Sequence, residues 1–345
     1  MNKIRIAING IGTVGKRIAH AVKLQDDMEL IAISDVAPTP TLRTVLEPNG
    51  PLYGVDLYAS NKWGLENLRN AGMYVNGTLE DLLKNGAVDV VVDATPAGIG
   101  EKNKSLYEKY GVKAIFQGGE KSYVAQVSFN AIANYEDAIG KQFIRVVSCN
   151  TTSLCRTLWH IDKAFGVDEV FVGLVRRAVD MWNDKKGPVD AIVPDLKFPS
   201  HHGPDVQTVM PWIRIKTLAV KVPTTLAHVH QVHVRLKTEV SREDVISVFN
   251  YATRILVFKG SEGYTSTATI IERFRDLLRP RHDMYEVAVW EETIGVDDKD
   301  IYWMHAVHQE SIIVPENIDA IRAAIGFEDK WKSIKKTNES LGIQK

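Results

Sequence analysis

The sequence predicts an α/β protein of two domains: a doubly wound domain with a parallel sheet, followed by an α+β domain with an antiparallel sheet. Three observations lead to this prediction. The chain has 345 residues, whereas ordinary domains have about 100–150. Apolar strands alternate with helical segments up to residue 148, a pattern typical of right-handed crossovers between parallel strands. Beyond that residue the expected strands are longer and closer together, which is typical of antiparallel pairing.

The composition excludes several classes of protein. Lys plus Arg number 42 and Asp plus Glu number 43, so the net charge of −1 gives no general attraction to nucleic acid or to an anionic membrane. Two cysteines, Cys149 and Cys155, are too few for a disulfide-stapled scaffold or a thiolate metal cage. The first residues lack the apolar core of a signal peptide, and no apolar run approaches the ~20 residues of a membrane-spanning helix. We therefore expect a cytoplasmic protein.

The first domain, residues 1–148, is expected to begin with a buried strand. Ile4, Ile6 and Ile8 share one face of this strand, and a glycine-containing loop and an amphipathic helix follow it. The second strand stops at Asp35, before two prolines that a continuing central strand does not tolerate. A helix and three further strands are expected at residues 79–84, 88–95, 112–117 and 143–148.

The second domain, residues 149–314, is expected to begin with a helix over residues 151–164. Ser241 stands three residues before Asp244, and this spacing predicts the start of another helix. The final segment, 315–345, is expected to be helical and to pack back on the first domain. Five strands are expected at residues 169–176, 213–222, 226–237, 284–294 and 301–307.

The loop after the first strand predicts a dinucleotide site. It reads Gly10-Ile11-Gly12-Thr13-Val14-Gly15 and lies between a buried strand and a helix. Glycines at this spacing permit a tight turn and the close approach of a pyrophosphate, while the helix N-terminus supplies free N–H donors and a favourable dipole. This makes the first domain a Rossmann-type fold.

Asp35 is the candidate that selects between NAD and NADP. It follows Gly15 by 20 residues, where an acidic side chain accepts hydrogen bonds from ribose hydroxyls and repels a 2′-phosphate. NAD is therefore expected. The alternatives are that Asp35 is a solvated turn residue, and that Arg43 in the following loop reaches a phosphate.

Cys149 stands where the last strand of the first domain meets the next helix. A thiolate at a helix N-terminus is stabilised by the dipole and by free N–H groups, and ligands bind beyond the carboxyl ends of strands in open α/β sheets. We interpret Cys149 as a nucleophile and Cys155, inside the helix, as a small core residue.

Three histidines lie in the strand expected at residues 226–237. Because side chains alternate along a strand, His228 and His230 share the apolar, covered face and His233 belongs to the polar face. A histidine beside Cys149 would hold it as a thiolate and serve as general base and acid. The alternative, which the alternation does not exclude, is a pair of hydrogen-bonded core histidines.

Two further pairs are candidates for binding a phosphate or a carboxylate. Arg176 and Arg177 end an apolar strand, so one side chain is expected to point inward and the other outward. His201 and His202 lie in a loop between two long strands, and a plain surface loop is the alternative. No metal is expected, because no further ligands stand at a familiar spacing.

Seven motifs occur in an order that is known from one family. They are Gly10-Ile11-Gly12-Thr13-Val14-Gly15, Gln117-Gly118-Gly119-Glu120, Ser148-Cys149-Asn150-Thr151-Thr152, Arg176-Arg177-Ala178, Ser200-His201-His202, Thr224-Thr225-Leu226-Ala227-His228-Val229-His230 and His308-Gln309-Glu310-Ser311. Over essentially its whole length the chain resembles the archaeal type of phosphorylating glyceraldehyde-3-phosphate dehydrogenase. The bacterial and eukaryotic enzymes carry Ser-Cys-Thr-Thr-Asn around the nucleophile instead.

The resemblance implies an activity and a set of roles. The activity is oxidation of D-glyceraldehyde 3-phosphate with NAD(P) and inorganic phosphate to 1,3-bisphosphoglycerate, through a thioester on Cys149 with His228 as acid/base partner. The residues implied to bind the cofactor are Gly10, Gly12, Thr13, Val14, Gly15, Asp35, Gly119, Arg177 and Gln309. The residues implied to bind the substrate are Ser148, Cys149, Asn150, Thr151, His201 and His202. Thr151, Thr152, Arg176 and the histidine pair are the candidates for an inorganic-phosphate subsite.

The resemblance also implies a cytoplasmic homotetramer working in glycolysis or gluconeogenesis. In one respect the chain departs from the family. Archaeal members often carry lysine-rich residues after the second strand, which suit NADP, whereas this chain has Ser34-Asp35-Val36-Ala37-Pro38. NAD is therefore the expected cofactor and NADP the alternative.

Three other functions compete with this interpretation. An aspartate-semialdehyde or N-acetyl-glutamyl-phosphate reductase-like dehydrogenase shares the two domains and the cysteine, but is expected to lack the Thr-Thr-Leu-x-His-x-His strand. A sugar oxidoreductase with a Glu-Lys-Pro motif is disfavoured because Ser122 follows Glu120-Lys121. A nucleotide-binding regulator without catalysis would leave Cys149 insensitive to alkylation.

Overall fold

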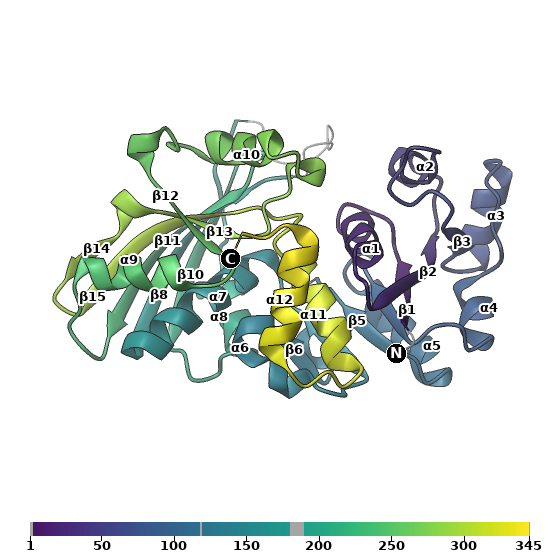
Figure 1. Cartoon of the computed structure of the whole chain (residues 1–345), viewed down its shortest axis with the longest axis horizontal. Coiled ribbons are helices and arrows are strands. Elements are labelled where there is room, and N and C mark those ends of the chain that lie inside the picture. Colours follow the sequence, from purple (N-terminus) through teal and green to yellow (C-terminus); the bar gives the residue numbers. More distant parts are fainter. Residues whose placement is uncertain (1–2, 118, 180–189, 345) are drawn as a thin grey trace. The chain divides into compact units, whose positions relative to one another are not determined.

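The computed structural model describes residues 3–117, 119–179 and 190–344, which form two compact units (Figure 1). Unit 1 consists of Met1–Ser148 and Val314–Gly342. Unit 2 consists of Cys149–Ile313 and Ile343–Lys345. The described residues do not include residues 1, 2 and 345, which belong to the expected segments, or Gly118, which belongs to the motif around Gly119.

Unit 1 is built on a seven-stranded sheet in which every neighbouring pair is parallel. Its strands are β1 (Ile4–Asn9), β2 (Met28–Asp35), β3 (Asp56–Ala59), β4 (Val90–Asp93), β5 (Lys113–Phe116), β6 (Val127–Phe129) and β7 (Phe143–Val146). The order is β3-β2-β1-β4-β5-β7-β6, so the direction of winding reverses between β1 and β4. Ligands of doubly wound sheets bind at such a reversal, beyond the carboxyl ends of the strands. The predicted doubly wound parallel sheet is confirmed.

The helices of unit 1 that precede residue 149 are α1 (Gly15–Lys23), α2 (Pro40–Leu46), α3 (Lys62–Asn70), α4 (Leu79–Lys84), α5 (Ile99–Lys109) and α6 (Ala131–Asn134). Of these, α2, α3, α4 and α6 begin with a side-chain cap, whereas α1 and α5 have none within the described residues. The Thr78 hydroxyl accepts from the Asp81 N–H, and the Asp81 carboxylate accepts from the Thr78 N–H. This capping box opens α4, the helix that was predicted at residues 79–84. Pro40 does more than end a strand, because it is the first residue of α2.

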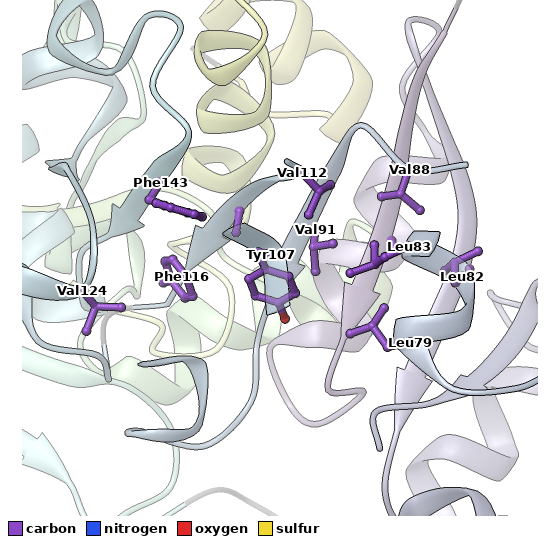
Figure 2. Packing of buried hydrophobic residues seen from close by; sticks show 13 residues of the cluster. Leu79, Leu82, Leu83, Val88, Val91, Tyr107, Val112, Phe116, Val124 and Phe143 are labelled. Atoms are coloured by element: carbon purple, nitrogen blue, oxygen red, sulfur yellow. The ribbon is translucent and has the colours of Figure 1, made fainter. Parts of the chain in front are cut away.

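One apolar cluster packs α4 and α5 against the sheet of unit 1 (Figure 2). It includes Leu79, Leu82 and Leu83 of α4, Val91 of β4 and Tyr107 of α5. Tyr107 is fully buried, and its hydroxyl donates to Asp93 Oδ2 at 2.6 Å. This bond satisfies the only polar atom of the side chain and fixes the carboxyl end of β4.

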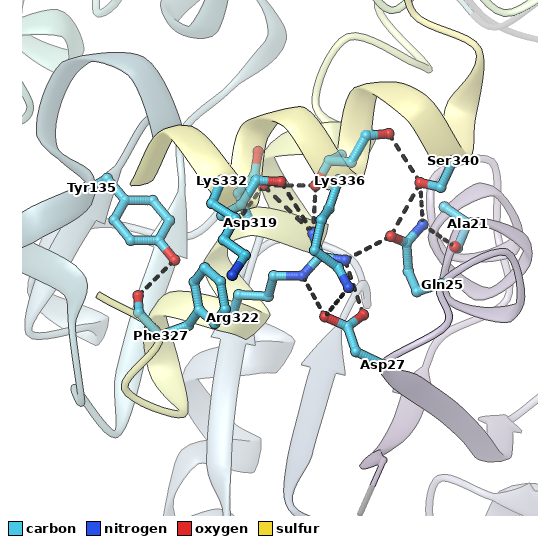
Figure 3. Close-up of polar contacts among 12 residues, drawn as sticks. Ala21, Gln25, Asp27, Tyr135, Asp319, Arg322, Phe327, Lys332, Lys336 and Ser340 are labelled. Atoms are coloured by element: carbon cyan, nitrogen blue, oxygen red, sulfur yellow. Dashed lines mark hydrogen bonds and ion pairs between the residues drawn. The ribbon is translucent and has the colours of Figure 1, made fainter. Parts of the chain in front are cut away.

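The C-terminal helices α11 (Val314–Ala324) and α12 (Lys330–Leu341) belong to unit 1 and are held there by a buried arginine (Figure 3). Arg322 Nε donates to Asp27 Oδ2 at 2.8 Å, between α1 and β2. Its Nη2 donates to Gln25 Oε1 at 2.8 Å and its Nη1 to Thr337 Oγ1 at 2.7 Å. One guanidinium therefore joins the end of the chain to its beginning.

Unit 2 is built on an eight-stranded sheet that is mixed rather than antiparallel throughout. Its strands are β8 (Val167–Arg177), β9 (Val193–Pro194), β10 (Ile215–Val222), β11 (His228–Leu236), β12 (Ile255–Phe258), β13 (Val287–Trp290), β14 (Gly295–Asp297) and β15 (Asp300–Val307). The order is β12-β13-β15-β11-β8-β10-β9, with β14 beside β15. The expected antiparallel pairing holds along β13-β15-β11-β8.

Two pairs in this sheet, β8 with β10 and β12 with β13, are parallel, and the sequence prediction missed them. The reason is the length of the connections: helix α8 (His202–Gln207) lies between β8 and β10, and α10 (Thr267–Asp276) lies between β12 and β13. Such connections allow a crossover, which parallel strands require. Apart from these pairs, the predicted α/β class with an α+β second domain is confirmed.

The histidines of β11 lie as the alternation predicted. His228, His230, Val232, Val234 and Leu236 are buried, whereas Gln231 and Arg235 are exposed. The helices α7 (Cys149–Phe165) and α9 (Arg242–Tyr251) supply further buried side chains of this unit, and α9 opens with the predicted capping box of Ser241 and Asp244.

Candidate active site

The three glycines of the loop after β1 have three different roles. Gly10 has φ +92°, and a Cβ there would lie 2.9 Å from the Ala94 carbonyl oxygen; a Cβ on Gly15 would lie 1.8 Å from the Gly10 carbonyl oxygen. Both positions therefore require glycine. A Cβ on Gly12 would meet no described atom within 4 Å, so the loop leaves open space beside its backbone. This combination fits a backbone that approaches a pyrophosphate closely.

Helix α1 adds donors to this open space. Val14 is its N-cap residue and makes no side-chain cap bond within the described chain. The N–H groups of Lys16 and Arg17 donate to the carbonyls of Gly12 and Val14, so any donors for an anion are those that precede Lys16. Thr13 precedes Val14, and the Thr13 carbonyl accepts from Arg17 Nη1 at 2.7 Å. The loop and the helix start fit the phosphates of a dinucleotide.

Asp35 ends β2 and braces the glycine loop. Its Oδ2 accepts from the Ile11 N–H at 2.8 Å, and its Oδ1 accepts from the Val36 N–H at 2.7 Å. Its Oδ1 also accepts from the Ala37 N–H at 3.2 Å. Asp35 is therefore a partly buried turn residue that is also bonded to the glycine loop, and these bonds fix the carboxylate beside the loop. Arg43 donates to the Ala71 carbonyl at 3.0 Å.

Gly119 lies just beyond β5, next to the loop that follows β4. A Cβ on Gly119 would meet Ala97 Cβ at 3.2 Å. Glu120 joins the two loops, because its Oε1 accepts from the N–H groups of Gly98 at 2.8 Å and Gly100 at 3.0 Å. Gly119, Asp35 and the glycine loop thus all stand at carboxyl ends of the parallel strands of unit 1.

In unit 2, Cys149 and His228 face each other. Cys149 is the first residue of α7 and is partly buried, and its Sγ lies 3.7 Å from His228 Nε2. His228, the first residue of β11, is fully buried. Cys155 is buried within the same helix, as a core residue would be.

The other ring nitrogen of His228 decides its tautomer. Nδ1 accepts from the backbone N–H of Arg177 at 2.9 Å, so a neutral ring carries its proton on Nε2. The Nε2–H group therefore faces the sulfur of Cys149.

Burial shifts the pKa of Cys149 and that of His228 in the directions that disfavour a thiolate–imidazolium ion pair. It raises the pKa of the Cys149 thiol to about 11, against the opposing effect of the Arg176 and Arg177 charges. It also lowers the pKa of His228 well below 6.5, and the same two arginines add to that effect. Burial therefore favours a thiol and a neutral imidazole over the ion pair, and it opposes the stabilisation of the thiolate expected from the helix N-terminus.

Basic groups gather around His202. His202 is fully buried, and its Nδ1 lies 3.1 Å from Ser200 Oγ, while its Nε2 makes no hydrogen bond with any described residue. The His201 ring lies against it, with 3.9 Å between the ring centroids and a tilt of 32° between the ring planes. Arg176 and His201 line a cavity of about 280 Å³ together with Lys221.

The remaining predicted residues of unit 2 are anchored by neighbours. Thr151 is buried and its hydroxyl donates to Asp205 Oδ2 at 2.6 Å. Arg177 is buried, and its Nη2 lies 3.1 Å from Glu310 Oε1. Gln309 precedes Glu310 and is partly buried. Ser148 immediately precedes Cys149 along the chain and belongs to unit 1. Arg176 is partly buried and Arg177 is buried, and the charges of both affect the pKa of Cys149, so opposite directions of the two side chains stay a prediction.

Sequence reasoning singled out His230 but missed His305 and Trp303, which extend its hydrogen bonds away from Asn150. His230 Nε2 lies 2.9 Å from Asn150 Oδ1, and His305 Nε2 lies 3.0 Å from His230 Nδ1. His305 and Trp303 stand two residues apart on β15, and strand alternation places both on the buried face of that strand. That alternation is the signal by which they could have been found.

Two features are absent from the described residues. No group of three or more His, Cys, Asp or Glu side chains there is arranged to hold a metal ion. No helix in that part of the chain has the length and apolar character to cross a membrane.

The fold and the site define a class. A doubly wound unit with a dinucleotide-type loop, followed by a mixed-sheet unit with a buried Cys–His pair, is the plan of a nicotinamide-dependent dehydrogenase that acts on an aldehyde. Residues 148–293 match the family model described as glyceraldehyde 3-phosphate dehydrogenase, C-terminal domain. Residues 4–118 match the model described as dihydrodipicolinate reductase, N-terminus.

Relatives cover the whole chain. Glyceraldehyde-3-phosphate dehydrogenases of Thermococcus kodakarensis and Pyrococcus furiosus are each 54% identical over 343 residues, which is 99% of this chain and 100% of theirs. Glyceraldehyde-3-phosphate dehydrogenase 2 of Methanosarcina barkeri is 52% identical over 345 residues, or 99% of each chain. The chain belongs to the glyceraldehyde-3-phosphate dehydrogenase family. The predicted resemblance is confirmed, and with it the prediction of an oxidoreductase that uses a nicotinamide cofactor.

Proposed function

We propose that the chain is a phosphorylating glyceraldehyde-3-phosphate dehydrogenase, which oxidises D-glyceraldehyde 3-phosphate with NAD and inorganic phosphate to 1,3-bisphosphoglycerate. Unit 1 is the dinucleotide-binding domain and unit 2 the catalytic domain. The observation that carries the proposal is the 3.7 Å contact between Cys149 Sγ and His228 Nε2 at the start of α7, in a chain with relatives of this name at 54% identity.

The reaction begins with the thiol of Cys149. Once its proton has left to solvent, the sulfur attacks the aldehyde carbon, and the carbonyl π electrons move to oxygen. The alkoxide is stabilised by N–H donors at the start of α7 and by the Nε2–H of His228. A nicotinamide cofactor held by the glycine loop and strand ends of unit 1 would supply the acceptor for the hydride of this carbon, whose loss leaves a thioester on Cys149. A phosphate oxygen then attacks the thioester carbon, the carbon–sulfur bond breaks, and the acyl phosphate leaves.

The tautomer of His228 bears on its role. With Nδ1 occupied by the Arg177 N–H, the neutral ring donates a hydrogen bond to the sulfur or the alkoxide, but it has no lone pair at Nε2 to accept a proton. Acting as a base therefore requires the other tautomer, in which the Arg177 bond is broken. We propose that donation is the first role and proton uptake the second.

Two sets of groups support phosphate binding. The Nε2 of His202 is buried without a described partner, as expected of a donor reserved for a ligand. The cavity lined by Arg176, His201 and Lys221 carries positive charge, although Asp195 also lines it. We assign substrate contacts to Ser148, Cys149, Asn150, Thr151, His201 and His202, and leave the two phosphates undivided between these groups.

The cofactor is assigned to the loop and strand ends of unit 1. We assign contacts to the glycines Gly10, Gly12 and Gly15, to Thr13, Val14, Asp35 and Gly119, and to Arg177 and Gln309 of unit 2. Both oxygens of Asp35 already accept backbone bonds, which keeps a negative charge beside the loop. That charge disfavours a 2′-phosphate and supports NAD over NADP.

We further propose a cytoplasmic homotetramer. One face of the sheet of unit 2 exposes large apolar side chains to solvent in the single chain. They are Phe171, Leu218, Tyr302 and Met304. Neighbouring exposed apolar residues of this kind mark surfaces that associate, and a second copy of the chain is the partner that the family suggests.

The test follows the absorbance of reduced cofactor with purified protein, D-glyceraldehyde 3-phosphate, and NAD or NADP, with and without inorganic phosphate. Phosphate-dependent reduction of NAD is the expected result. Reduction that needs no phosphate would indicate thioester hydrolysis, and no reduction would direct attention to aspartate semialdehyde and N-acetyl-glutamate semialdehyde.

Paired cysteine variants serve as controls. Cys149→Ser should abolish turnover and spare dinucleotide binding, measured by calorimetry. Cys155→Ser, in the same helix but buried in the core, should retain turnover. Full activity in Cys149→Ser would remove Cys149 from the mechanism.

A further inference from the structure

Four buried side chains form a line of hydrogen bonds that ends at the residue after Cys149. Trp303 Nε1 donates to His305 Nδ1 at 3.0 Å. His305 Nε2 lies 3.0 Å from His230 Nδ1. His230 Nε2 lies 2.9 Å from Asn150 Oδ1. All four side chains are at most 2% exposed.

The fold brings these residues together across two strands and a helix. His230 on β11 is paired in register with His305 on β15, and Val232 with Trp303. Asn150 is the second residue of α7. The whole line lies within unit 2, on the covered face of its sheet.

Trp303 can only donate a hydrogen bond, and this determines which atom donates in each of the other bonds of the line. The indole N–H of Trp303 is only a donor, so His305 Nδ1 carries no proton and a neutral His305 has its proton on Nε2. That proton is donated to His230 Nδ1, so the proton of His230 is on Nε2. The atom of Asn150 that faces it must then be the oxygen.

Two observations agree with this direction. Burial lowers the pKa of His305 to about 3 and the pKa of His230 well below 6.5, so both rings are neutral. Ser153 Oγ lies 3.3 Å from His230 Nδ1 but donates its hydrogen to the Asn150 carbonyl at 2.9 Å. His305 therefore remains the donor to His230.

We propose that His230 is a positioning residue: with His305 and Trp303 it anchors the amide oxygen of Asn150, so that the amide N–H₂ is held for an oxygen of the bound aldehyde substrate. No described residue accepts from Asn150 Nδ2. An amide without this anchor presents oxygen and nitrogen about equally, and an oxygen turned to the substrate repels the developing alkoxide. This inference rests on the proposed function of Cys149 and its substrate.

A double-mutant cycle tests the path through Asn150. We expect His230→Leu to lower kcat/KM for D-glyceraldehyde 3-phosphate by about tenfold to a hundredfold, mostly in kcat, as loss of a preorganised donor does. In the Asn150→Ala background the same change should alter kcat/KM by less than about twofold, because sites that act as a unit are not additive. His230→Gln keeps an N–H near the position of Nε2 and should recover most of the loss.

Controls separate positioning from damage to the fold. His160→Leu makes the same change in α7, at a histidine whose Nδ1 contacts its own helix at the Arg156 carbonyl, and should leave turnover unchanged. Alkylation of Cys149 by iodoacetamide should stay within about twofold of wild type in His230→Leu, because His230 is not the histidine that contacts Sγ. If His230→Leu does not fold, Trp303→Phe replaces it. Trp303→Phe should lower kcat/KM in the wild-type background and leave it unchanged in the Asn150→Ala background.

A readout independent of turnover keeps this inference separate from the proposed function. In protein labelled with ¹⁵N at the histidine rings, the signals that disappear in His230→Gln and His305→Gln should be those of Nε2–H tautomers. An Nδ1–H tautomer at either residue, or equal losses of kcat/KM in both backgrounds, overturns the positioning role. A wild-type protein that is inactive on the aldehyde contradicts the proposed function instead, and the tautomers then decide the inference.

Discussion

The backbone N–H of Arg177 donates to Nδ1 of His228 at 2.9 Å, and through this bond the end of β8 controls the ring that faces Cys149. The same residue carries a buried guanidinium that is paired with Glu310. The main chain of Arg177 thus sets the tautomer of His228, while its side chain adds positive charge near the thiol.

This arrangement predicts how Cys149 reacts with pH. Because burial raises the pKa of the thiol to about 11, the thiolate is a small fraction at neutral pH and grows as the pH rises. The rate of alkylation by iodoacetamide should therefore climb steadily from pH 7 to pH 10. A rate that levels off below pH 8 would show that the thiolate is already stabilised.

His228→Asn removes the Nε2–H donor and should slow alkylation at pH 7 by about fivefold, the equivalent of about 1 kcal/mol; an unchanged rate would assign the donor to another group.

Asp35 gives the second prediction, on cofactor choice. Asp35→Asn removes the negative charge and keeps the size of the side chain, so the preference for NAD over NADP should narrow by about tenfold, the equivalent of about 1.4 kcal/mol of repulsion. The measurement is kcat/KM for each cofactor at fixed substrate. Glu29→Gln, an exposed acid on the same strand, is the matched control and should leave the ratio unchanged. If Asp35→Asn keeps the wild-type ratio of kcat/KM for NAD to kcat/KM for NADP, then Asp35 holds the Ile11 N–H but does not select the cofactor.

Local patterns were enough to predict much of unit 1. The glycine loop, the helix at residues 79–84 and the apolar strands are properties of consecutive residues, and the structure has elements at all of them. The segment with β3 and α3 was not resolved from the sequence, because α3 buries little more than Gly64 and Leu68. Its helix depends on Asn61, whose side chain accepts from the Gly64 N–H.

The site of unit 2 was predictable only in part. Alternation along β11 separated His228 and His230 from His233, because it depends on the chain alone. The hydrogen-bond partner of His228 is a backbone group 51 residues away, which has no side-chain signature. The parallel pairs of the sheet likewise depend on which strands become neighbours, and spacing along the chain does not determine that.

The buried histidines predict a loss of stability in acid. The pKa of His202 and that of His305 are both lowered from 6.5 to about 3 by burial. Between pH 6.5 and 3 the unfolded chain binds these protons and the folded chain does not, so stability is fully present above 6.5 and falls below it. Each such histidine makes the free energy of unfolding decrease by about 1.4 kcal/mol per pH unit. Urea unfolding at pH 7, 6 and 5 measures this slope, and His305→Gln should make it shallower; an equal slope in that variant would contradict the assignment.

Arg322 gives the last prediction, which separates a buried ion pair from an exposed one in the same region (Figure 3). The Arg322 side chain is fully buried, and its guanidinium lies 2.8 Å from Asp27 and 3.8 Å from the fully buried Asp319. Arg322→Met leaves the buried Asp319 without its cation and leaves Asp27 only the more distant Lys336 Nζ at 3.5 Å, so it should lower the free energy of unfolding by about 3–5 kcal/mol. Lys336→Met removes a cation from Asp26, whose side chain is 81% exposed, and a more distant one, at 3.5 Å, from Asp27, which keeps Arg322. It should cost less than about 1 kcal/mol. Urea unfolding of both variants at pH 7 gives the comparison. Equal losses would mean that the network of Arg322 is no stronger than a surface pair, and that the C-terminal helices are held in unit 1 mainly by apolar packing.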